Sequence, residues 1–239
     1  MTEHRIALVT GANRGIGFET THQLARRGWT VWLGSRNRER GDESRASLLE
    51  LVPNADVRAV ALDVTSDESV VAARDTVAQA SGRIDILVNN AGISGRFLAP
   101  DETVPADIVP VYDVNVLGPV RVTSAFLPLL RRSDDPRLVM VSSGMGSFGI
   151  TTDPERLEST MHGLAYPSSK AALNMITSQY AKSLPGIRVN AVDPGYTATD
   201  FNAHHGTQTV EQGTEAVIQA CTAERQPSVF TDRHGVIPW

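Results

Sequence analysis

A tyrosine and a lysine four residues apart, Tyr166 and Lys170, are the pair in this sequence best suited to acid–base chemistry. At this spacing in a helix, both side chains project from the same face. A lysine ammonium beside a phenol stabilises the phenolate and lowers a pKa that is normally about 10. Tyr166 could then exchange a proton with a carbonyl or alcohol oxygen. Such pairs also arise by chance on many helices, so the spacing alone is weak evidence.

A glycine-rich turn near the N-terminus is the second feature with chemical meaning. The run TGANRGIG, residues 10–17, connects a predicted strand to a predicted helix. Glycines let the backbone turn tightly and approach a pyrophosphate, and the helix N-terminus supplies N–H donors and the positive end of its dipole. A turn without a ligand is the alternative. The position between the first strand and the first helix favours a nucleotide site.

Short apolar segments alternate with helical patterns along the chain, and they predict the elements that must position these residues. Continuous runs rich in Val, Ile and Leu are typical of strands that are buried on both faces of a parallel sheet. The predicted strands are Ile6–Val9, Thr30–Leu33, Val57–Leu62, Ile86–Val88, Leu138–Val141, Val189–Val192 and Val229–Phe230. The predicted helices are Gly15–Arg27, Arg38–Leu51, one from an N-cap at Thr65 to about Gly82, two between Val104 and Arg132, Tyr166–Leu184, and Val210–Thr222.

Composition limits the classes of protein that fit. The 239 residues are 41% hydrophobic and 21% charged, which is typical of a folded globular chain and excludes a disordered or collagen-like one. With 22 basic and 27 acidic residues the net charge is −5, so no overall basic surface for nucleic acid is expected. The single cysteine, Cys221, fits a reducing cytosol, and no run is apolar enough to predict a membrane helix. These features predict a cytoplasmic protein.

The glycine turn has the spacing GxxxGxG and resembles the motif of the short-chain dehydrogenase/reductase family. Further blocks similar to those of that family follow in order: NNAG at 89–92, Asn115, Ser142-Ser143, YPSSK at 166–170, and PGYT at 194–197 with Thr199. The resemblance runs from about Arg5 to Val229, and within the family the chain looks most like the carbonyl reductases. It implies one α/β domain over residues 1–239, a Rossmann-type, three-layer, doubly wound parallel sheet of about seven strands.

The resemblance also implies roles for four residues. Tyr166 would be the acid/base, Lys170 would tune its pKa, Ser143 would hold the substrate oxygen, and Asn115 would hold a water in a proton path to the lysine. Ser142 is the alternative to Ser143, and Asn115 could equally pin a helix backbone. The implied reaction is NADPH-dependent reduction of a ketone or aldehyde to an alcohol, and its reverse.

The residues after the second predicted strand bear on the choice of cofactor. NAD sites usually place an acid there to bond the ribose 2′-hydroxyl, but residues 33–38 read LGSRNR. Arg36, together with Arg14 in the glycine turn, suits a 2′-phosphate, although Arg36 and Arg38 could also be solvated. NADP(H) is therefore predicted. The predicted cofactor residues are Gly11, Asn13, Arg14, Gly15, Ile16, Gly17, Ser35, Arg36, Asp63, Val64, Asn90, Ala91, Gly92, Tyr166, Lys170, Pro194, Gly195, Thr197 and Thr199.

Two segments, at about 144–165 and about 196–209, are predicted to form the substrate side, because both follow the carboxyl ends of strands. The first resembles a short form of the insertion in carbonyl-reductase-like members. It lies beside helices that many members use for dimer and tetramer contacts, so dimer, tetramer and monomer all stay open. The candidate substrate residues are Ile93, Phe97, Met145, Phe148, Leu164, Tyr196 and Phe201. They are mostly apolar and predict a lipophilic carbonyl compound.

Two other functions stay open at this point. A non-enzymatic NADP(H)-binding regulator can share the fold, but such a protein is expected to have lost part of the catalytic set. A sugar-nucleotide epimerase or dehydratase shares the tyrosine and lysine, but resembles TGxxGxxG and needs more than the roughly 40 residues that follow Thr199. No metal site is predicted, because His204-His205 lacks other ligands at suitable spacing.

Overall fold

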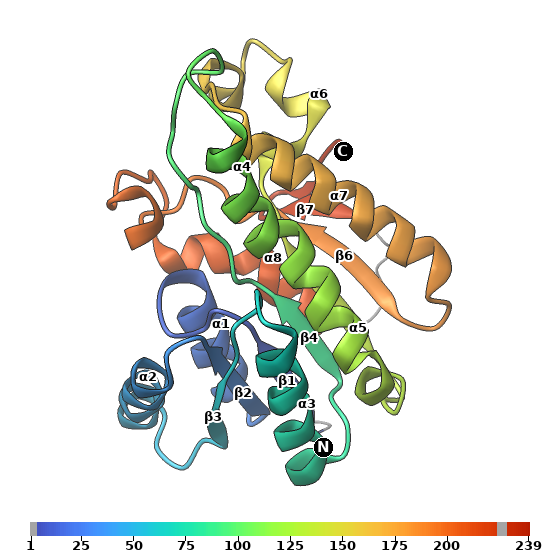
Figure 1. Cartoon of the computed structure of the whole chain (residues 1–239). Helices are drawn as coiled ribbons and strands as arrows, with labels where there is room; N and C mark the ends of the chain where they lie inside the picture. The colour runs from blue at the N-terminus through green and yellow to red at the C-terminus, as the bar shows by residue number, and fades with distance from the viewer. Residues whose placement is uncertain (1–3, 224–228) are drawn as a thin grey trace.

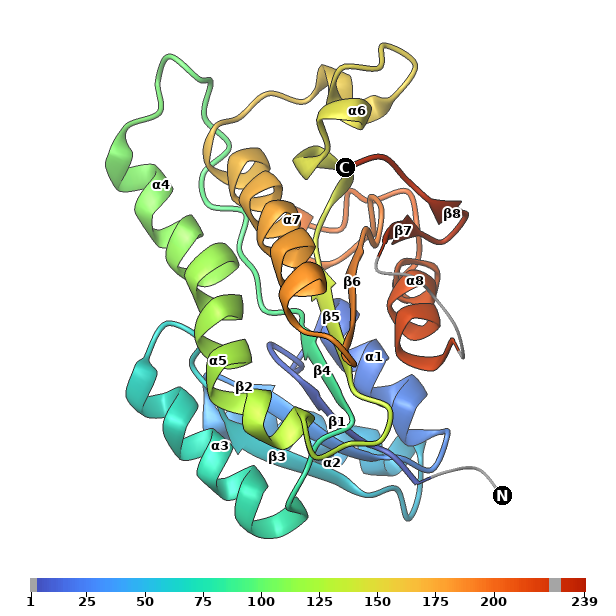
Figure 2. The ribbon, with the colours of Figure 1, turned by 90° about the vertical axis from the view of Figure 1, so that its right-hand side faces the viewer.

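The computed structural model describes residues 4–223 and 229–239, and its centre is an eight-stranded sheet with helices on both faces (Figures 1 and 2). The strand order is β3-β2-β1-β4-β5-β6-β7-β8. The strands are β1 (Ile6–Val9), β2 (Thr30–Ser35), β3 (Val57–Ala61), β4 (Ile86–Asn89), β5 (Arg137–Val141), β6 (Arg188–Val192), β7 (Phe230–Asp232) and β8 (Gly235–Val236). The first seven pair in parallel, which confirms the predicted doubly wound architecture.

Helices and strands alternate almost throughout the chain. The helices are α1 (Gly15–Ala25), α2 (Arg38–Leu51), α3 (Asp67–Ser81), α4 (Pro105–Tyr112), α5 (Gly118–Leu130), α6 (Phe148–Thr151), α7 (Ala165–Ser183) and α8 (Val210–Thr222). The eighth strand was not predicted. It is a two-residue strand that runs antiparallel to β7, and its first residue, Gly235, has a φ of +137°.

The side chains of β1 show why the sheet is covered on both faces. Successive residues of a strand point to opposite sides, and all four residues of β1 are buried. Ile6 and Leu8 join a core cluster with residues of α3, α5 and α7, while Ala7 and Val9 join a second cluster with residues of α1, α2 and α8. Figure 2 shows these two helical layers on opposite sides of the strands. A continuous apolar strand therefore needs both layers.

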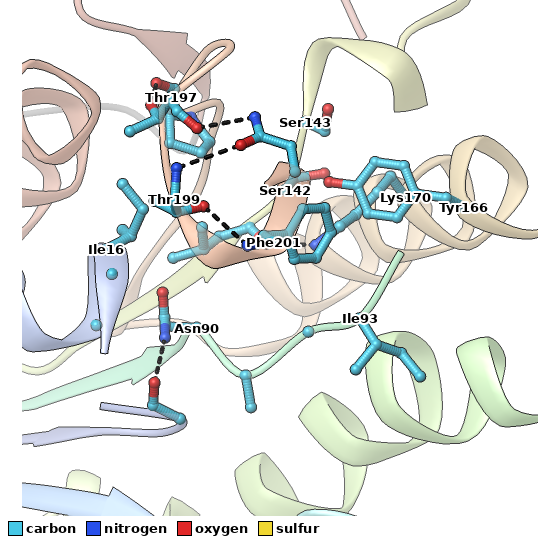
Figure 3. A pocket seen from close by; sticks show the side chains of 18 of the residues that line it. Ile16, Asn90, Ile93, Ser142, Ser143, Tyr166, Lys170, Thr197, Thr199 and Phe201 are labelled. Atoms are coloured by element: carbon cyan, nitrogen blue, oxygen red, sulfur yellow. Dashed lines mark hydrogen bonds between the residues drawn. The ribbon is translucent and has the colours of Figure 1, made fainter. Parts of the chain in front are cut away.

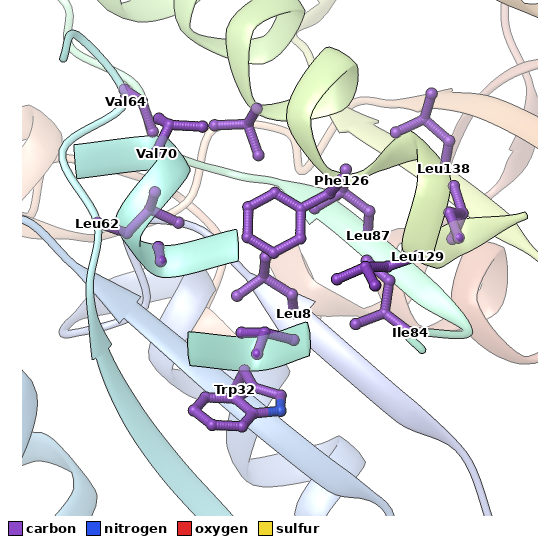
Figure 4. Packing of buried hydrophobic residues seen from close by; sticks show 14 of the residues in the cluster. Leu8, Trp32, Leu62, Val64, Val70, Ile84, Leu87, Phe126, Leu129 and Leu138 are labelled. Atoms are coloured by element: carbon purple, nitrogen blue, oxygen red, sulfur yellow. The ribbon is translucent and has the colours of Figure 1, made fainter. Parts of the chain in front are cut away.

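Phe126 of α5 lies at the centre of the first cluster (Figure 4). Its ring is fully buried among residues of the strands and of α3. Trp32 closes one end of the cluster, and its indole N–H donates a hydrogen bond to Ser81 Oγ at 3.0 Å. This packing fixes β4 and β5 against α5, so that both strands end at the same edge of the sheet.

The predicted start of α3 is wrong by one residue. Thr65 was expected to cap the helix, but its hydroxyl donates to the Asp63 carboxylate at 2.7 Å. Ser66 is the N-cap instead, and its hydroxyl accepts from the Ser69 N–H at 3.1 Å. A neighbouring carboxylate thus decided which of two adjacent hydroxyls was free to cap the helix.

Replacing Phe126 with alanine should lower the free energy of unfolding by about 3–5 kcal/mol, because the change opens a cavity that the sheet and helices cannot fill. Phe148→Ala is the matched control, since that ring is 76% exposed. Guanidinium unfolding of both variants measures the difference. Equal midpoints for Phe126→Ala and wild type would show that the cluster does not depend on this ring.

Candidate active site

The carboxyl ends of β1, β4, β5 and β6 open into a cleft of about 350 Å³. Loops from these ends, the residues after β3 and the start of α7 line it. Every predicted cofactor residue except Ser35 lines this cleft, as do five of the substrate candidates: Ile93, Phe97, Met145, Tyr196 and Phe201. Ligands of open α/β sheets bind at this edge.

The glycine turn is held in shape by Asn90, at the end of β4 (Figure 3). Asn90 Nδ2 donates to the carbonyl oxygens of Thr10 at 2.8 Å and of Gly11 at 3.2 Å. A Cβ on Gly17 would lie 2.5 Å from that same nitrogen, so no larger residue fits there. Gly11 and Gly15 have φ values of +61° and +54°, which side chains rarely allow. The shape of the turn therefore depends on these glycines and on the Asn90 amide.

Asn115 lies beneath the cleft and does not line it. It belongs to a π-helical turn, Asp113–Leu117, that joins α4 to α5. Its Nδ2 donates to Ile93 O at 2.8 Å and to Ser169 Oγ at 3.0 Å, and its Oδ1 accepts from Ile93 N at 2.9 Å. A π turn widens the helix and often occurs at functional sites. Here it allows one buried amide to join the loop after β4 to α7.

Tyr166 and Lys170 lie on one face of the first turns of α7, as their spacing predicted (Figure 3). Lys170 Nζ donates to Val141 O at 2.9 Å and is 5.5 Å from the centre of the Tyr166 ring. Loss of water around the Lys170 ammonium lowers its pKa to about 8, and the charge of Asp193 opposes this change. The lysine head is thus fixed between the end of β5 and the tyrosine.

The pKa of Tyr166 is raised above its ordinary value, whereas the sequence predicted that it would be lowered. Burial of the phenol is the largest cause, because it penalises the charged form. A hydrogen bond from Ser143 acts in the opposite direction, and the negative charge of Asp193 adds to the increase. The phenol therefore keeps its proton at neutral pH.

Ser142 and Ser143 follow β5 but face different surroundings. The Ser143 hydroxyl reaches Tyr166 and accepts from the Met145 N–H at 3.2 Å. The Ser142 hydroxyl is buried and donates to Asn174 Oδ1 at 2.5 Å. Both serines line the cleft, and the Ser142 hydroxyl is already bonded to α7.

Asp193, directly after β6, was missed by the sequence analysis. Its side chain is almost completely buried, and its carboxylate accepts hydrogen bonds from the backbone N–H groups of Gly195, at 2.9 Å, and Gly144. Burial raises the pKa of Asp193. An acid that ends an apolar strand and precedes Pro194-Gly195 was the available signal. This carboxylate joins the turn after β5 to the loop after β6.

The rim of the cleft carries an ion pair between its two sides. Arg14 Nη1 of the glycine turn is 3.2 Å from Asp200 Oδ2 in the loop after β6. His204 Nε2 is 2.9 Å from the other oxygen of Asp200, and both side chains are exposed. Arg36 also lines the cleft, from the segment that joins β2 to α2. Two arginines therefore lie at the mouth of the predicted cofactor site.

Besides Asn115, three predicted site residues lie outside the cleft. Ser35 is buried and donates to Asn37 O at 2.8 Å, so it helps to turn the chain into α2. Phe148 is exposed on α6, and Leu164 precedes α7 without lining the cleft. From the same insertion, Leu157 and Met161 line the cleft instead. Of the three apolar residues predicted from the insertion to bind substrate, Met145 lines the cleft, whereas Phe148 and Leu164 do not.

Aromatic rings flank the tyrosine. The centroid of the Phe201 ring is 5.4 Å from that of Tyr166, and the centroid of Phe97 is 6.3 Å away. Phe97 comes from the loop after β4, and Phe201 comes from the loop after β6. Because both rings remain partly exposed, they present apolar surface on two sides of the phenol.

Residues 4–223 and 229–239 contain neither a cluster of metal ligands nor a membrane-spanning helix. In that part of the chain, no group of three or more His, Cys, Asp or Glu side chains could hold a metal ion. None of the helices there combines the length and the hydropathy that a membrane crossing requires.

Comparison with known proteins identifies the family. The family model described as short chain dehydrogenase matches residues 5–209. The (+)-neomenthol dehydrogenase of Arabidopsis thaliana is 36% identical in an alignment that covers 93% of each chain. The NADPH-bound carbonyl reductase from chicken fatty liver has a TM-score of 0.86 at 29% identity, covering 99% of this chain and 100% of that one. Salutaridine reductase from Papaver somniferum has a TM-score of 0.83 at 30% identity, covering 96% and 99%. The ordered sequence blocks, the sheet and these matches agree: the chain belongs to the short-chain dehydrogenase/reductase family.

Proposed function

We propose that this protein reduces a ketone or aldehyde to an alcohol with NADPH and catalyses the reverse oxidation. The observation that carries the proposal is that Ser143, Tyr166 and Lys170 line the same cleft, with Lys170 Nζ 5.5 Å from the centre of the Tyr166 ring. Relatives named as a carbonyl reductase and a salutaridine reductase support a carbonyl substrate. All four predicted catalytic residues are present and adjacent, which argues against a regulator without activity.

Tyr166 is the proton donor in this proposal. Its raised pKa keeps the phenol neutral at neutral pH, which is the form needed for reduction. Ser143 donates a second hydrogen bond to the substrate oxygen and stabilises the negative charge that develops there. Lys170 faces the Tyr166 ring and supplies positive charge as the proton leaves. Asn115 holds the floor beneath them by bonding Ile93 and Ser169.

The cleft fits a dinucleotide. The turn over Gly11–Gly17 leaves backbone N–H groups at the start of α1 free of side-chain obstruction, which suits a pyrophosphate. Arg14 and Arg36 would hold the 2′-phosphate, Asp63 the adenine, and residues 194–199 the carboxamide end. When bound, the reduced nicotinamide supplies the hydride that reaches the carbonyl carbon.

A small lipophilic carbonyl compound is the proposed substrate. Phe97 and Phe201 flank Tyr166, and Leu157 and Met161 add apolar surface from the insertion. We place the reaction in the cytoplasm, since the single cysteine, Cys221, is buried and unpaired and needs no oxidising compartment. Dimer, tetramer and monomer are all compatible with this cleft.

Changing Tyr166 to phenylalanine should reduce kcat by about 10²–10⁴-fold, because the ring stays but the proton donor is lost. NADPH should bind almost as tightly as to wild type. Tyr180→Phe, on the same helix and away from the cleft, is the control and should keep full turnover. The assay is NADPH consumption with a panel of aldehydes, ketones and quinones, together with NADPH fluorescence titration. A Tyr166→Phe variant with more than about a tenth of wild-type kcat would refute the acid role.

Changing Arg36 to aspartate should abolish the preference for NADPH over NADH. Hydrogen bonds to a charged group are worth roughly 1.5–3 kcal/mol each, so Arg14 and Arg36 together support a preference of about 10²-fold. The new carboxylate repels the 2′-phosphate and accepts from the ribose hydroxyls instead.

Arg38→Asp is the matched control, because Arg38 is exposed, pairs with Asp42 and does not line the cleft. The dissociation constants of NADPH and NADH are measured for each variant at fixed salt. An unchanged ratio in Arg36→Asp, or equal binding of both cofactors by wild type, would remove Arg36 from the site.

Leu157→Ala should change the relative kcat/KM for bulky and small ketones, since Leu157 lines the cleft from the insertion. The unfolding midpoint should move little, because the side chain is 53% exposed. Leu51→Ala on α2, at a position 59% exposed and outside the cleft, is the control. If Leu157→Ala lost stability and kept the same substrate range, the insertion would serve the fold instead of the substrate.

A further inference from the structure

Ser143 lies in a short turn, and hydrogen bonds from α7 hold one residue before it and one residue after it. Ser142, directly before it, donates its hydroxyl hydrogen to Asn174 Oδ1 at 2.5 Å. The carbonyl oxygen of Gly146, three residues after it, accepts from Asn174 Nδ2 at 3.1 Å. Ser142, Gly146 and Asn174 are all buried, so neither bond can be exchanged easily for water. A single amide thus spans the turn that carries Ser143.

The same helix carries the other reacting groups. Asn174 is one helical turn beyond Lys170 and two turns beyond Tyr166, so all three project from a similar face of α7. The turn also packs directly on this helix, since a Cβ on Gly146 would lie 2.5 Å from the Lys170 carbonyl carbon. The backbone of the turn therefore contacts α7 at Lys170, and the hydrogen bonds of Asn174 hold it there.

Of the common side chains of this size, only an amide satisfies both partners. The Ser142 hydroxyl needs an acceptor, and the Gly146 carbonyl needs a donor. Leucine provides neither, and an aspartate would place a negative oxygen against the Gly146 carbonyl oxygen. A buried polar group without its partner is costly, so either change should move the turn.

We propose that Asn174 is a positioning residue for the reduction, because its amide fixes the turn that places the Ser143 hydroxyl beside Tyr166. This inference rests on the proposed function. It assigns Ser142 a part as well: its hydroxyl is one of the two attachment points of that amide and does not contact substrate. Asn174 acts on the substrate oxygen only through Ser143.

The test is a double-mutant cycle between Asn174→Leu and Ser143→Ala, with kcat and the NADPH dissociation constant measured for each protein. In the wild-type background, Asn174→Leu should lower kcat about tenfold, a size typical of coupled neighbours, with NADPH binding unchanged. In the Ser143→Ala background it should lower kcat less than about twofold, because the hydroxyl that it positions is already gone. Equal losses in both backgrounds would overturn the proposal.

Two further variants guard against a general defect in folding. Thr177→Val removes a buried hydroxyl one turn further along α7 that bonds only Leu173 O of its own helix, at 2.7 Å, and it should keep wild-type kcat. Ser142→Ala removes one attachment point with little change in volume, and should lower kcat without affecting NADPH binding.

These outcomes separate the two proposals. Unchanged kcat in Ser142→Ala, or a loss in Thr177→Val equal to that in Asn174→Leu, would refute the positioning role while leaving the proposed function in place. A wild-type protein that binds NADPH but reduces no carbonyl compound would refute both.

Discussion

Buried backbone groups at the ends of parallel strands are the constraint on which this cleft depends. Beyond the last ladder bond, N–H and C=O groups have no neighbouring strand to pair with, yet they lie inside the protein and need partners. Three asparagine amides meet this need. Asn90 bonds the glycine turn after β1, Asn115 bonds Ile93 after β4, and Asn174 bonds the turn after β5. Asn115 and Asn174 each use both the donor and the acceptor of the amide, and Asn90 uses its donor for two carbonyl oxygens.

Buried charge is arranged around the same edge. Lys170 and Asp193 are both buried. Burial lowers the pKa of Lys170 and raises the pKa of Asp193, which favours the neutral form of each side chain. The negative charge of Asp193 opposes that change at Lys170 by attraction. Phe97 and Phe201 flank Tyr166, and burial of the phenol together with the negative charge of Asp193 keeps its proton in place. The site therefore combines an apolar approach for substrate with a polar floor.

The framework was predictable because its signals are local. Continuous apolar runs marked the strands within about two residues, and the order of the motifs placed Ser143, Tyr166 and Lys170 at one edge. The errors fall where one particular side-chain contact, local or long-range, decides the outcome. The Asp63 carboxylate accepts a hydrogen bond from the Thr65 hydroxyl, which leaves Ser66 to cap α3. The Ser35 hydroxyl donates to Asn37 O, in the loop between β2 and α2. Phe148 looked like a pocket residue by composition, but Ser147 next to it is bonded to Pro238 O, at the far end of the chain.

The order of strands in the sheet separates the loop proposed to select the cofactor from the insertion proposed to face the substrate. Arg36 follows β2, whereas the insertion follows β5, and β1 and β4 lie between those strands. The two loops thus reach the cleft from different sides and share no strand pairing. Changes in one loop leave the backbone of the other undisturbed, so natural or laboratory selection can exchange the cofactor and the substrate in independent steps.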